Sequence, residues 1–325
     1  MNWQGKSALV TGAGGFIGSH LAEELARRGA AVRALVHYNA LGTRGWLSDD
    51  SLGIEVVAGD VCDMDSIAEA MKDVEIVFHL AALIAIPYSY RVPRSYVHTN
   101  VVGTVHVLQA ARQARVARVV HASTSEVYGT AQYVPIDEKH PLQAQSPYSA
   151  SKIAGDKLAE SFHLSYGVPV VTVRPFNTYG PRQSARAIIP TIVMQCLGGG
   201  PVRLGNLHPT RDLSYVQDTV RGFMLAGQSR KGEGQVINLG SGREISIGDL
   251  AQLIGRLMNR TVHVESDRQR IRPPGSEVDR LVADSSRALS LLGWESSVSL
   301  EEGLARTIEW IQKNQERYGR NNYVV

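Results

Sequence analysis

The chain of 325 residues predicts an α/β fold, a doubly wound parallel sheet followed by a smaller mixed α/β part. Two observations in the first half of the chain carry this prediction. Short runs of apolar, β-branched residues alternate with amphipathic helical patterns, as in a parallel sheet that is covered by helices on both faces. A glycine-rich turn joins the first of these runs to the first helical pattern, where such a sheet binds a ligand.

Six strands are expected, and the first helix should follow the glycine-rich turn. That helix spans residues 16–28 and ends at Gly29, which suits a C-terminal cap. After Pro175 the pattern weakens into shorter elements and arginine-rich loops. We therefore expect a dinucleotide-binding domain at 1–174 and a mainly substrate-binding part at 175–325, from which segments near 211–240 return to the first domain. The expected strands are residues 7–11, 31–36, 55–58, 76–80, 118–123 and 168–174.

The composition is that of a soluble globular protein, with 43% hydrophobic and 20% charged residues. A formal net charge of +3 suits anionic small molecules, and without a Lys/Arg block it argues against nucleic acid as a partner. Cys62 and Cys196 have neither metal-ligand nor disulfide-framework spacing, which indicates a reducing compartment. We find no signal peptide and no apolar stretch of about 20 residues, so we expect a cytoplasmic protein that does not span a membrane.

The turn at residues 11–18 has the features of a dinucleotide-binding loop. Its glycines permit a tight turn and close approach of the backbone, and the helix behind it offers free N–H groups to a pyrophosphate. The strand before the turn and the helix after it favour dinucleotide binding over a merely flexible turn. The expected cofactor-binding residues of this turn are Gly12, Gly15, Phe16, Ile17 and Gly18.

The second and third strands should end beside the adenosine half of the cofactor. Asp60 follows the third strand and is placed to reach the adenine, although a helix N-cap is an equally good interpretation. The second strand ends in VHYN (residues 36–39), without the carboxylate that normally binds the ribose 2′-hydroxyl. Arg33, His37 or Arg44 could instead face a 2′-phosphate. We expect NAD, and the sequence leaves NADP open.

Tyr148 and Lys152 form the candidate catalytic pair. Residues four apart share one face of a helix, and a neighbouring ammonium together with an oxidised nicotinamide should lower the pKa of the Tyr148 phenol. The phenolate can then take a proton from an alcohol, while Thr124 hydrogen-bonds the reacting oxygen. Glu126 offers a second base. A Tyr-x-x-x-Lys spacing alone is also found on helix surfaces, so the glycine loop and the Ser/Thr-rich strand end strengthen this interpretation.

The chain resembles the extended short-chain dehydrogenase/reductases, the NAD-dependent epimerase/dehydratase family, which acts on nucleotide sugars and has a Rossmann fold. Three further stretches, ALIAIPYSY, YGTAQYVPIDEKHPLQ and FNTYGPRQSARAIIPTI, closely resemble the nucleotide-N-acetylglucosamine 4,6-dehydratases of legionaminic acid biosynthesis. The family motifs run nearly end to end: TGAGGFIGSH, FHLAAL, TNVVGT, STSEVYG, SPYSASK, RPFNTYGPRQ, RDLSYVQD, INLGSG and LGW…SLEEGL.

This resemblance implies a reaction on UDP- or GDP-N-acetylglucosamine. Tyr148 and the cofactor would oxidise the C4 alcohol, and the ketone would acidify the C5 proton. Glu126 would remove that proton, water would leave from C6, and hydride would return to C6. The product would be a 4-keto-6-deoxy sugar nucleotide, and the cofactor would be regenerated in each turnover.

One position departs from the glucose-nucleotide 4,6-dehydratases, which carry Asp-Glu where this chain has Ser125-Glu126. Serine is a poor acid, so Glu126 would handle both proton transfers, directly or through a water. The sequence Thr-Ser-Glu also resembles UDP-glucuronate decarboxylases, which makes decarboxylation a competitor. Two further alternatives are a 4-epimerase, which has no need of Glu126, and a non-catalytic dinucleotide-binding sensor.

The resemblance also places ligand contacts outside the motifs discussed so far. Substrate contacts fall on Asn177 and, for the diphosphate, on Arg211 and Arg272; Arg186 is a further candidate, although a solvated surface charge explains it as well. A homodimer is expected through helices near residues 93–112 and 148–165. The cofactor contacts implied by the resemblance are Val61, Leu80, Ala81, Ala82 and Asn100, besides Asp60, Tyr148 and Lys152.

Overall fold

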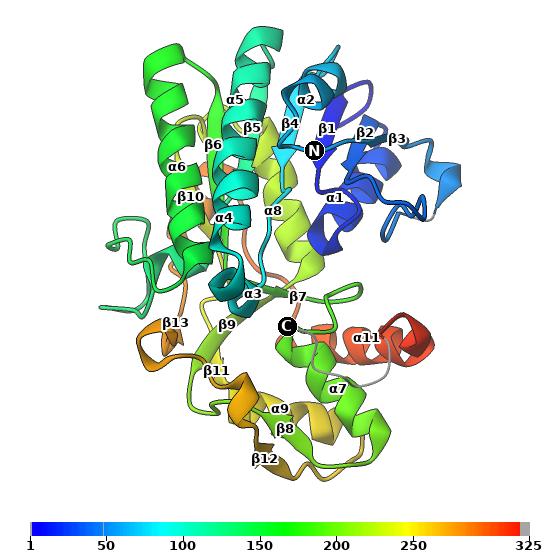
Figure 1. Ribbon diagram of the computed structural model, residues 1–325, viewed down its shortest axis with the longest axis vertical. Helices are drawn as coiled ribbons and strands as arrows, with labels where there is room; N and C mark the ends of the chain where they lie inside the picture. The colour runs from blue at the N-terminus through cyan, green and yellow to red at the C-terminus, as the bar shows by residue number, and fades with distance from the viewer. Residues whose placement is uncertain (1, 48, 319–325) are drawn as a thin grey trace.

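The computed structural model describes residues 2–47 and 49–318. Its larger layer is a sheet of seven parallel strands in the spatial order β10-β6-β5-β4-β1-β2-β3 (Figure 1). The chain runs outward from β1 to β3 and then returns to β4 on the other side of β1, which opens a ligand crevice at the carboxyl ends of β1 and β4. The strands are β1 Ser7–Thr11, β2 Ala31–Val36, β3 Glu55–Ala58, β4 Ile76–His79, β5 Arg118–Ala122, β6 Val170–Pro175 and β10 Val236–Leu239.

Helices cover both faces of this sheet (Figure 1). On one face, α1 and α8 pack against each other and against the central strands, and α10 lies beside β10. On the other face, α2, α5 and α6 enclose a second apolar core. The helices are α1 Phe16–Arg27, α2 Met64–Ala70, α3 Ile86–Arg91, α4 Pro93–Val97, a π-helical turn His98–Val102, α5 Gly103–Ala114, α6 Pro147–Tyr166, α8 Val216–Gln228 and α10 Ser286–Leu292.

The smaller part is built around a sheet in which β9 pairs with β11, β13 and β7. A separate pair of strands, β8 and β12, lies beside α7 and α9 at the far end of the molecule (Figure 1). The elements of the smaller part are β7 Asn177–Tyr179, α7 Ile188–Gly198, β8 Val202–Leu204, β9 Thr210–Tyr215, β11 Glu244–Ser246, α9 Ile247–Leu257, β12 Val264–Ser266, β13 Arg280–Leu281 and α11 Leu300–Lys313. Single 3₁₀ turns lie at Asp50–Leu52, Ser125–Tyr128, Arg268–Arg270, Pro274–Ser276 and Gln315–Tyr318.

The predicted fold class is confirmed. The six expected strands are present, and their ends differ from the prediction by two residues at most. The first helix ends at Arg27, and Gly29 two residues later has a φ of +87°, a conformation that glycine adopts without strain. Among the helices of the described residues, none combines the length and the apolar character needed to cross a membrane.

The chain passes between the two parts more than once. β7 leaves the end of β6 and starts the smaller part, α8 and β10 return to the large sheet, and β11 leaves it again. β9, at residues 210–215, belongs to the small sheet. The carboxyl ends of the central strands therefore face the smaller part (Figure 1).

Candidate functional site

The glycine-rich turn between β1 and α1 has the shape that a dinucleotide needs. Gly12 has a φ of +68°, and a Cβ at this position would lie only 2.8 Å from the backbone nitrogen of Ala81. Gly15 caps α1 without a side-chain hydrogen bond, so the backbone N–H groups at Phe16, Ile17 and Gly18 begin a helix that no side chain caps. A closely packed turn and an uncapped helix N-terminus fit a pyrophosphate, so this part of the chain fits NAD.

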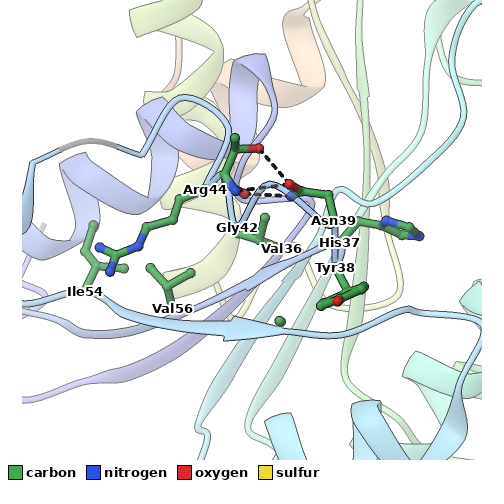
Figure 2. A pocket seen from close by; sticks show the side chains of 10 residues that line it. Val36, His37, Tyr38, Asn39, Gly42, Arg44, Ile54 and Val56 are labelled. Carbon is green, nitrogen blue, oxygen red and sulfur yellow. Dashed lines mark hydrogen bonds between the residues drawn. The ribbon is translucent and has the colours of Figure 1, made fainter.

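A hollow of about 310 Å³ lies between the ends of β2 and β3, beside the glycine-rich turn. Figure 2 shows Arg44, Ile54 and Val56 at one end of this hollow and His37 with its neighbours at the other. The His37 imidazole is 3.4 Å from the carboxylate of Asp60. None of the described residues that line the hollow carries a carboxylate, so the lining suits a ribose with either a 2′-hydroxyl or a 2′-phosphate.

Asp60 closes the turn after β3. Its Oδ1 accepts a 2.9 Å hydrogen bond from the backbone N–H of Cys62. The helix N-cap is instead Asp63, whose carboxylate accepts from the N–H groups of Asp65 and Ser66. The alternative interpretation of Asp60 as a helix N-cap is therefore wrong, because the N-cap lies three residues later in the chain.

The loop after β2 covers the glycine-rich turn. The amide side chain of Asn39 donates to the Thr43 carbonyl and accepts from its N–H, which closes the loop on itself (Figure 2). The backbone N–H of Trp46 then donates a 3.0 Å hydrogen bond to the carbonyl of Gly14. The Trp46 ring packs edge-on against Trp310 of α11, 5.2 Å between centroids. The C-terminal helix thus holds this loop in place over the turn.

The end of β4 is fixed by a chain of buried hydroxyl and imidazole groups. The Thr11 hydroxyl accepts from the N–H groups of Leu80 and Ala81, each at 3.1 Å, so it donates to Nδ1 of His79. Nε2 of His79 then donates to the Thr104 hydroxyl, which itself donates to a carbonyl. Burial lowers the pKa of His79 well below its usual value, which agrees with this neutral tautomer.

Asn100, an expected cofactor contact, has three protein partners for its side chain. Its Oδ1 accepts from the N–H of Leu83, and its Nδ2 donates to the Leu83 carbonyl and to the Ser151 hydroxyl. Asn100 lies in the π-helical turn before α5 and is buried. The amide therefore shapes the loop after β4 and fastens it to α6. Of the other expected contacts, Val61 is buried and Ala82 is half-buried at the same sheet edge.

The end of β5 turns directly into a single 3₁₀ turn that carries the candidate base. The Thr124 hydroxyl caps this turn by accepting from the N–H of Glu126 at 3.2 Å. Ser125 and Glu126 are both buried, with 2% and 8% of their surfaces exposed. The negative charge of Glu126 acts on Tyr148 and on Arg211, so the carboxylate lies between the catalytic helix and the substrate side.

Tyr148 lies in the first turn of α6, which begins at a capping box formed by Ser146 and Ser149. Burial raises the pKa of the Tyr148 phenol, the nearby Thr124 hydroxyl opposes the shift, and the Glu126 charge adds to it. The predicted lowering came from Lys152 together with an oxidised nicotinamide, and in the protein alone burial gives the opposite direction. The prediction omitted desolvation, which outweighs the neighbouring groups at a fully enclosed phenol.

Lys152 is buried one helical turn further along α6. Its ammonium donates a 2.6 Å hydrogen bond to the carbonyl oxygen of Ala122, the last residue of β5. Burial lowers the pKa of Lys152 to about 8, and the charge of Asp156 opposes this shift. The sequence did not single out Asp156, although its spacing of four from Lys152 is the same helical signal that revealed the Tyr–Lys pair.

The substrate side brings two of the expected arginines together. Arg211 of β9 and Arg272 lie 3.7 Å and 3.8 Å from the same carboxylate oxygen of Glu277. Arg211 is buried, and burial lowers its pKa while the charge of Glu126 opposes the shift. Asn177 presents a buried Oδ1 that has no partner among the described residues, which suits a ligand donor. Arg186 is exposed, and its charge acts on Tyr96.

Comparison with known proteins shows a family match over most of the chain. The family model described as GDP-mannose 4,6 dehydratase matches residues 9–307. The chain is 35% identical to a dTDP-glucose 4,6-dehydratase of Streptomyces antibioticus (94% of this chain, 92% of the relative). It is 34% identical to a UDP-glucose 4-epimerase of Mycolicibacterium smegmatis (95% and 99%) and 33% identical to a UDP-N-acetyl-alpha-D-glucosaminuronate decarboxylase of Bacillus cytotoxicus (95% and 98%).

Solved structures agree with this match. An epimerase from Methanothermobacter thermautotrophicus superposes with a TM-score of 0.90 at 33% identity, covering 97% of this chain and 95% of that one. A dTDP-glucose 4,6-dehydratase from Streptomyces venezuelae, solved with NAD bound, superposes with a TM-score of 0.87 at 31% identity, covering 97% and 100%. The three reaction types among these proteins share one fold, so the side chains of the site must distinguish them.

Proposed function

Because the chain belongs to the NAD-dependent epimerase/dehydratase family of extended short-chain dehydrogenase/reductases, we propose that it is a nucleotide-sugar 4,6-dehydratase. The observation that carries this proposal is the buried Glu126 carboxylate, next to Tyr148 and facing Arg211. A 4-epimerase needs only the Tyr–Lys pair, whereas elimination of water across C5 and C6 needs a further base. Burying a carboxylate costs free energy, which favours a working role for it.

The proposed substrate is UDP- or GDP-N-acetylglucosamine, and the product is the 4-keto-6-deoxy sugar nucleotide. The choice of sugar rests on the resemblance of the 82–90 and 176–192 segments to the dehydratases of legionaminic acid biosynthesis. Arg211 and Arg272 would bind the diphosphate, because guanidinium groups form charge-assisted hydrogen bonds with phosphate oxygens. The unpaired Oδ1 of Asn177 would accept a hydrogen bond from the sugar nucleotide.

The first half of the reaction is the work of Tyr148, Thr124 and Lys152. Tyr148 takes the proton from O4 of the sugar, and the Thr124 hydroxyl hydrogen-bonds the same oxygen. The positive charge of Lys152, one helical turn away, would favour the phenolate form of Tyr148, against the burial that raises the pKa of the phenol. When bound, NAD supplies the hydride acceptor for oxidation at C4 and the hydride donor for reduction at C6.

The second half of the reaction depends on Glu126. The C4 ketone acidifies the C5 proton, which Glu126 removes, and the C6 hydroxyl then leaves as water with that proton. Ser125 has no acidic proton to offer, so the single carboxylate handles both transfers. The proton that Tyr148 took from O4 balances the one finally delivered to C5. The net change is the loss of one water.

The isotope experiment that tests this proposal uses sugar nucleotide deuterated at C4. A dehydratase of this type gives product with deuterium at C6, as mass spectrometry and NMR detect. Unlabelled C6 in a dehydrated product would contradict the internal return of hydride. The enzyme is then incubated with a panel of UDP- and GDP-sugars, and mass spectrometry detects the loss of water. This identifies the sugar and the nucleotide base of the substrate. No turnover of any sugar in this panel would overturn the proposal and leave a non-catalytic sensor.

Decarboxylation is the second candidate, and Ser125 is the observation that favours it. The Thr-Ser-Glu turn lacks the aspartate of the glucose-nucleotide dehydratases, and the chain is 33% identical to a glucosaminuronate decarboxylase. A uronate has a carboxylate where the dehydratase substrate has its C6 hydroxyl. Release of carbon dioxide from a UDP-uronate, with no dehydration of N-acetylglucosamine nucleotides, would decide for this activity.

The choice between NAD and NADP is a further proposal. NAD is the cofactor of the family, and we propose that NADP also binds, because the VHYN segment places His37 rather than a carboxylate at the end of β2. Titration of the protein with NAD and NADP, followed by tyrosine and tryptophan fluorescence, compares the two dissociation constants. NADP binding more than about a hundredfold weaker than NAD binding, roughly 3 kcal/mol, would overturn this proposal.

We also propose a homodimer that buries the outer surfaces of α5 and α6. Leu164 and Tyr166 near the end of α6 are 75% and 51% exposed, as is usual for side chains that a second subunit covers. The mass of the protein in solution, measured by light scattering, tests this assembly. Leu164→Glu should shift the mass towards that of a single chain.

A further inference from the structure

Three functional groups follow one another along a single face of α6. Tyr148, Lys152 and Asp156 are spaced by four residues, so each lies one helical turn from the next. All three are buried, and Asp156 exposes only 4% of its surface. The first two have roles in the proposed reaction, whereas Asp156 lies behind them, one turn further from the 3₁₀ turn that carries Glu126.

The Asp156 carboxylate is clamped by groups from two strands of the large sheet. Arg174 of β6 approaches its Oδ2 with Nε at 3.0 Å and Nη2 at 2.9 Å. Nε2 of His121, on β5, lies 3.3 Å from its Oδ1. Burial alone would raise the pKa of Asp156, but His121 and Arg174 overcome that effect and hold it at about 2. Asp156 is therefore an anion at every physiological pH.

Arg174 is itself held in place by further hydrogen bonds. Nη1 of Arg174 donates a 2.9 Å hydrogen bond to the hydroxyl of Tyr128, and that hydroxyl donates to Oδ1 of Asn238 at 2.7 Å. The backbone N–H of Asn238 donates to Glu138. This chain of hydrogen bonds fixes Arg174, and Arg174 in turn fixes the Oδ2 side of the carboxylate, while Oδ1 has, among the described residues, only the 3.3 Å contact with His121.

We infer that Asp156 is a positioning residue of this enzyme: its fixed, buried negative charge keeps Lys152 in the ammonium form that bonds the Ala122 carbonyl. The geometry carries the inference, because Asp156 lies one turn from Lys152 on the same helix face and cannot move away. A positive charge at Lys152 is what the oxidation step needs, since a neutral amine would give no support to the Tyr148 phenolate.

Among the described residues, Asp156 is the negative charge that acts on Lys152. His79 on β4 and His121 on β5 both interact with Lys152, and burial lowers the pKa of each, so both are neutral near pH 7. Arg174 on β6 is a cation, and Tyr148 on the same helix is a neutral phenol because burial raises its pKa. The charge of Glu126 acts on Tyr148 and Arg211.

The balance of charge explains what Asp156 must do. Lys152 and Arg174 are two buried cations, and Asp156 is the anion between them. Without it, two uncompensated positive charges would share a desolvated layer, and the lysine would lose its proton because arginine cannot. Burial already lowers the pKa of Lys152 to about 8, so a small further fall of this pKa would make the amine neutral at physiological pH.

The direct test titrates Lys152 by NMR in protein labelled with ¹³C at the lysine ε-carbons, and Lys152→Arg identifies the signal. Asp156→Asn keeps the size of the side chain and removes its charge. We expect the titration midpoint of Lys152 to fall by at least about one pH unit, a tenfold change in the equilibrium. An unchanged or higher midpoint would overturn the inference.

Two further variants test whether the midpoint of Lys152 falls because a charge is lost or because the structure is disturbed. Asp218→Asn is the matched control, because Asp218 is equally buried and hydrogen-bonded by Ser297 and Val298, away from α6. It should leave the Lys152 midpoint where it is, and a fall as large as that in Asp156→Asn would contradict the inference. If Asp156→Asn does not fold, Asp156→Asn combined with Arg174→Gln removes both partners of the ion pair, and the midpoint should still fall, by less than in Asp156→Asn because the repulsion from Arg174 is removed as well.

A kinetic measurement separates positioning from a purely structural role. In Asp156→Asn, kcat should fall with rising pH at a lower pH than in the wild type, while KM for the sugar nucleotide stays within about twofold. Asp156→Glu restores the charge and should move the profile back towards the wild type. The kinetic part rests on the proposed function, but the NMR titration needs no substrate, so the two can fail separately.

Discussion

The ammonium of Lys152 donates a 2.6 Å hydrogen bond to the carbonyl oxygen of Ala122, which ties the catalytic helix to the end of β5. Two residues beyond Ala122, Thr124 starts the 3₁₀ turn that carries Glu126. The acid–base groups for the two halves of the proposed reaction therefore share one attachment between α6 and the sheet. The attachment depends on a proton that the lysine holds only weakly.

Replacing Lys152 by methionine should change how stability depends on pH. The pKa of Lys152 is about 8 in the folded protein and 10.5 for an unperturbed lysine, so the unfolded chain binds more protons between these values. The stability of the wild type should therefore rise with pH across this window, by up to roughly 3 kcal/mol relative to Lys152→Met. Urea denaturation of both proteins at about pH 7 and about pH 10 measures this. A difference that stays constant with pH would contradict it.

Glu126→Gln should stop dehydration and leave the oxidation at C4. The amide keeps the size of the side chain but cannot accept the C5 proton, so kcat for product should fall by about 10²–10⁴-fold. Reduced cofactor should then accumulate, as its near-ultraviolet absorbance records in a stopped-flow experiment. Full turnover by this variant would exclude Glu126 as the base at C5.

Gly12→Ala should weaken dinucleotide binding by more than tenfold. Its φ of +68° strains an alanine by about 1–2 kcal/mol, and the new Cβ would collide with the backbone at Ala81. Gly53→Ala is a matched control, because Gly53 has a φ of +62° and a Cβ added there would meet no atom within 4 Å. Both variants should lose similar stability from strain, whereas calorimetric titration with NAD should show a loss of affinity only for Gly12→Ala.

Arg211→Gln should raise KM for the sugar nucleotide much more than it lowers kcat. The variant loses charge-assisted hydrogen bonds to the diphosphate, about 1.5–3 kcal/mol, or roughly 10- to 100-fold in affinity. Arg280→Gln is the comparison, since Arg280 lies on the neighbouring strand β13 and pairs with Glu244 on the surface. Equal effects of the two substitutions on KM would argue against a diphosphate site at Arg211.

The parts of the fold that depend on neighbouring residues in the chain could be predicted from the sequence. Ala31–Val36 is a run of apolar and β-branched residues broken only by Arg33, and it forms β2 with those bounds. Ser146 followed by Pro147 is a local signal for the start of a helix, and the capping box of α6 forms there. Tyr148 and Lys152 share a helix face for the same reason. In each case the residues that decide the structure are neighbours in the chain.

The parts that could not be predicted depend on residues distant in the chain. Arg174 on strand β6 reaches Asp156 on helix α6, and Glu277 comes close to both Arg211 and Arg272 because the smaller part of the chain folds back on itself. The direction of the Tyr148 pKa shift was wrong for a related reason. Enclosure by the protein sets that pKa, and enclosure is a property of the whole fold.

The 3₁₀ turn Ser125–Tyr128 has a consequence for how such enzymes diversify. It is four residues long and is capped by Thr124, while α6 is anchored independently by its own capping box. Ser125 and Glu126, the first two residues of the turn, can therefore be exchanged without changing the cap of α6, whereas Tyr128 is tied to that helix through Arg174. A short turn beside the Tyr–Lys pair lets one scaffold carry different second bases after very few mutations, and it is the segment to exchange when one activity is redesigned into another.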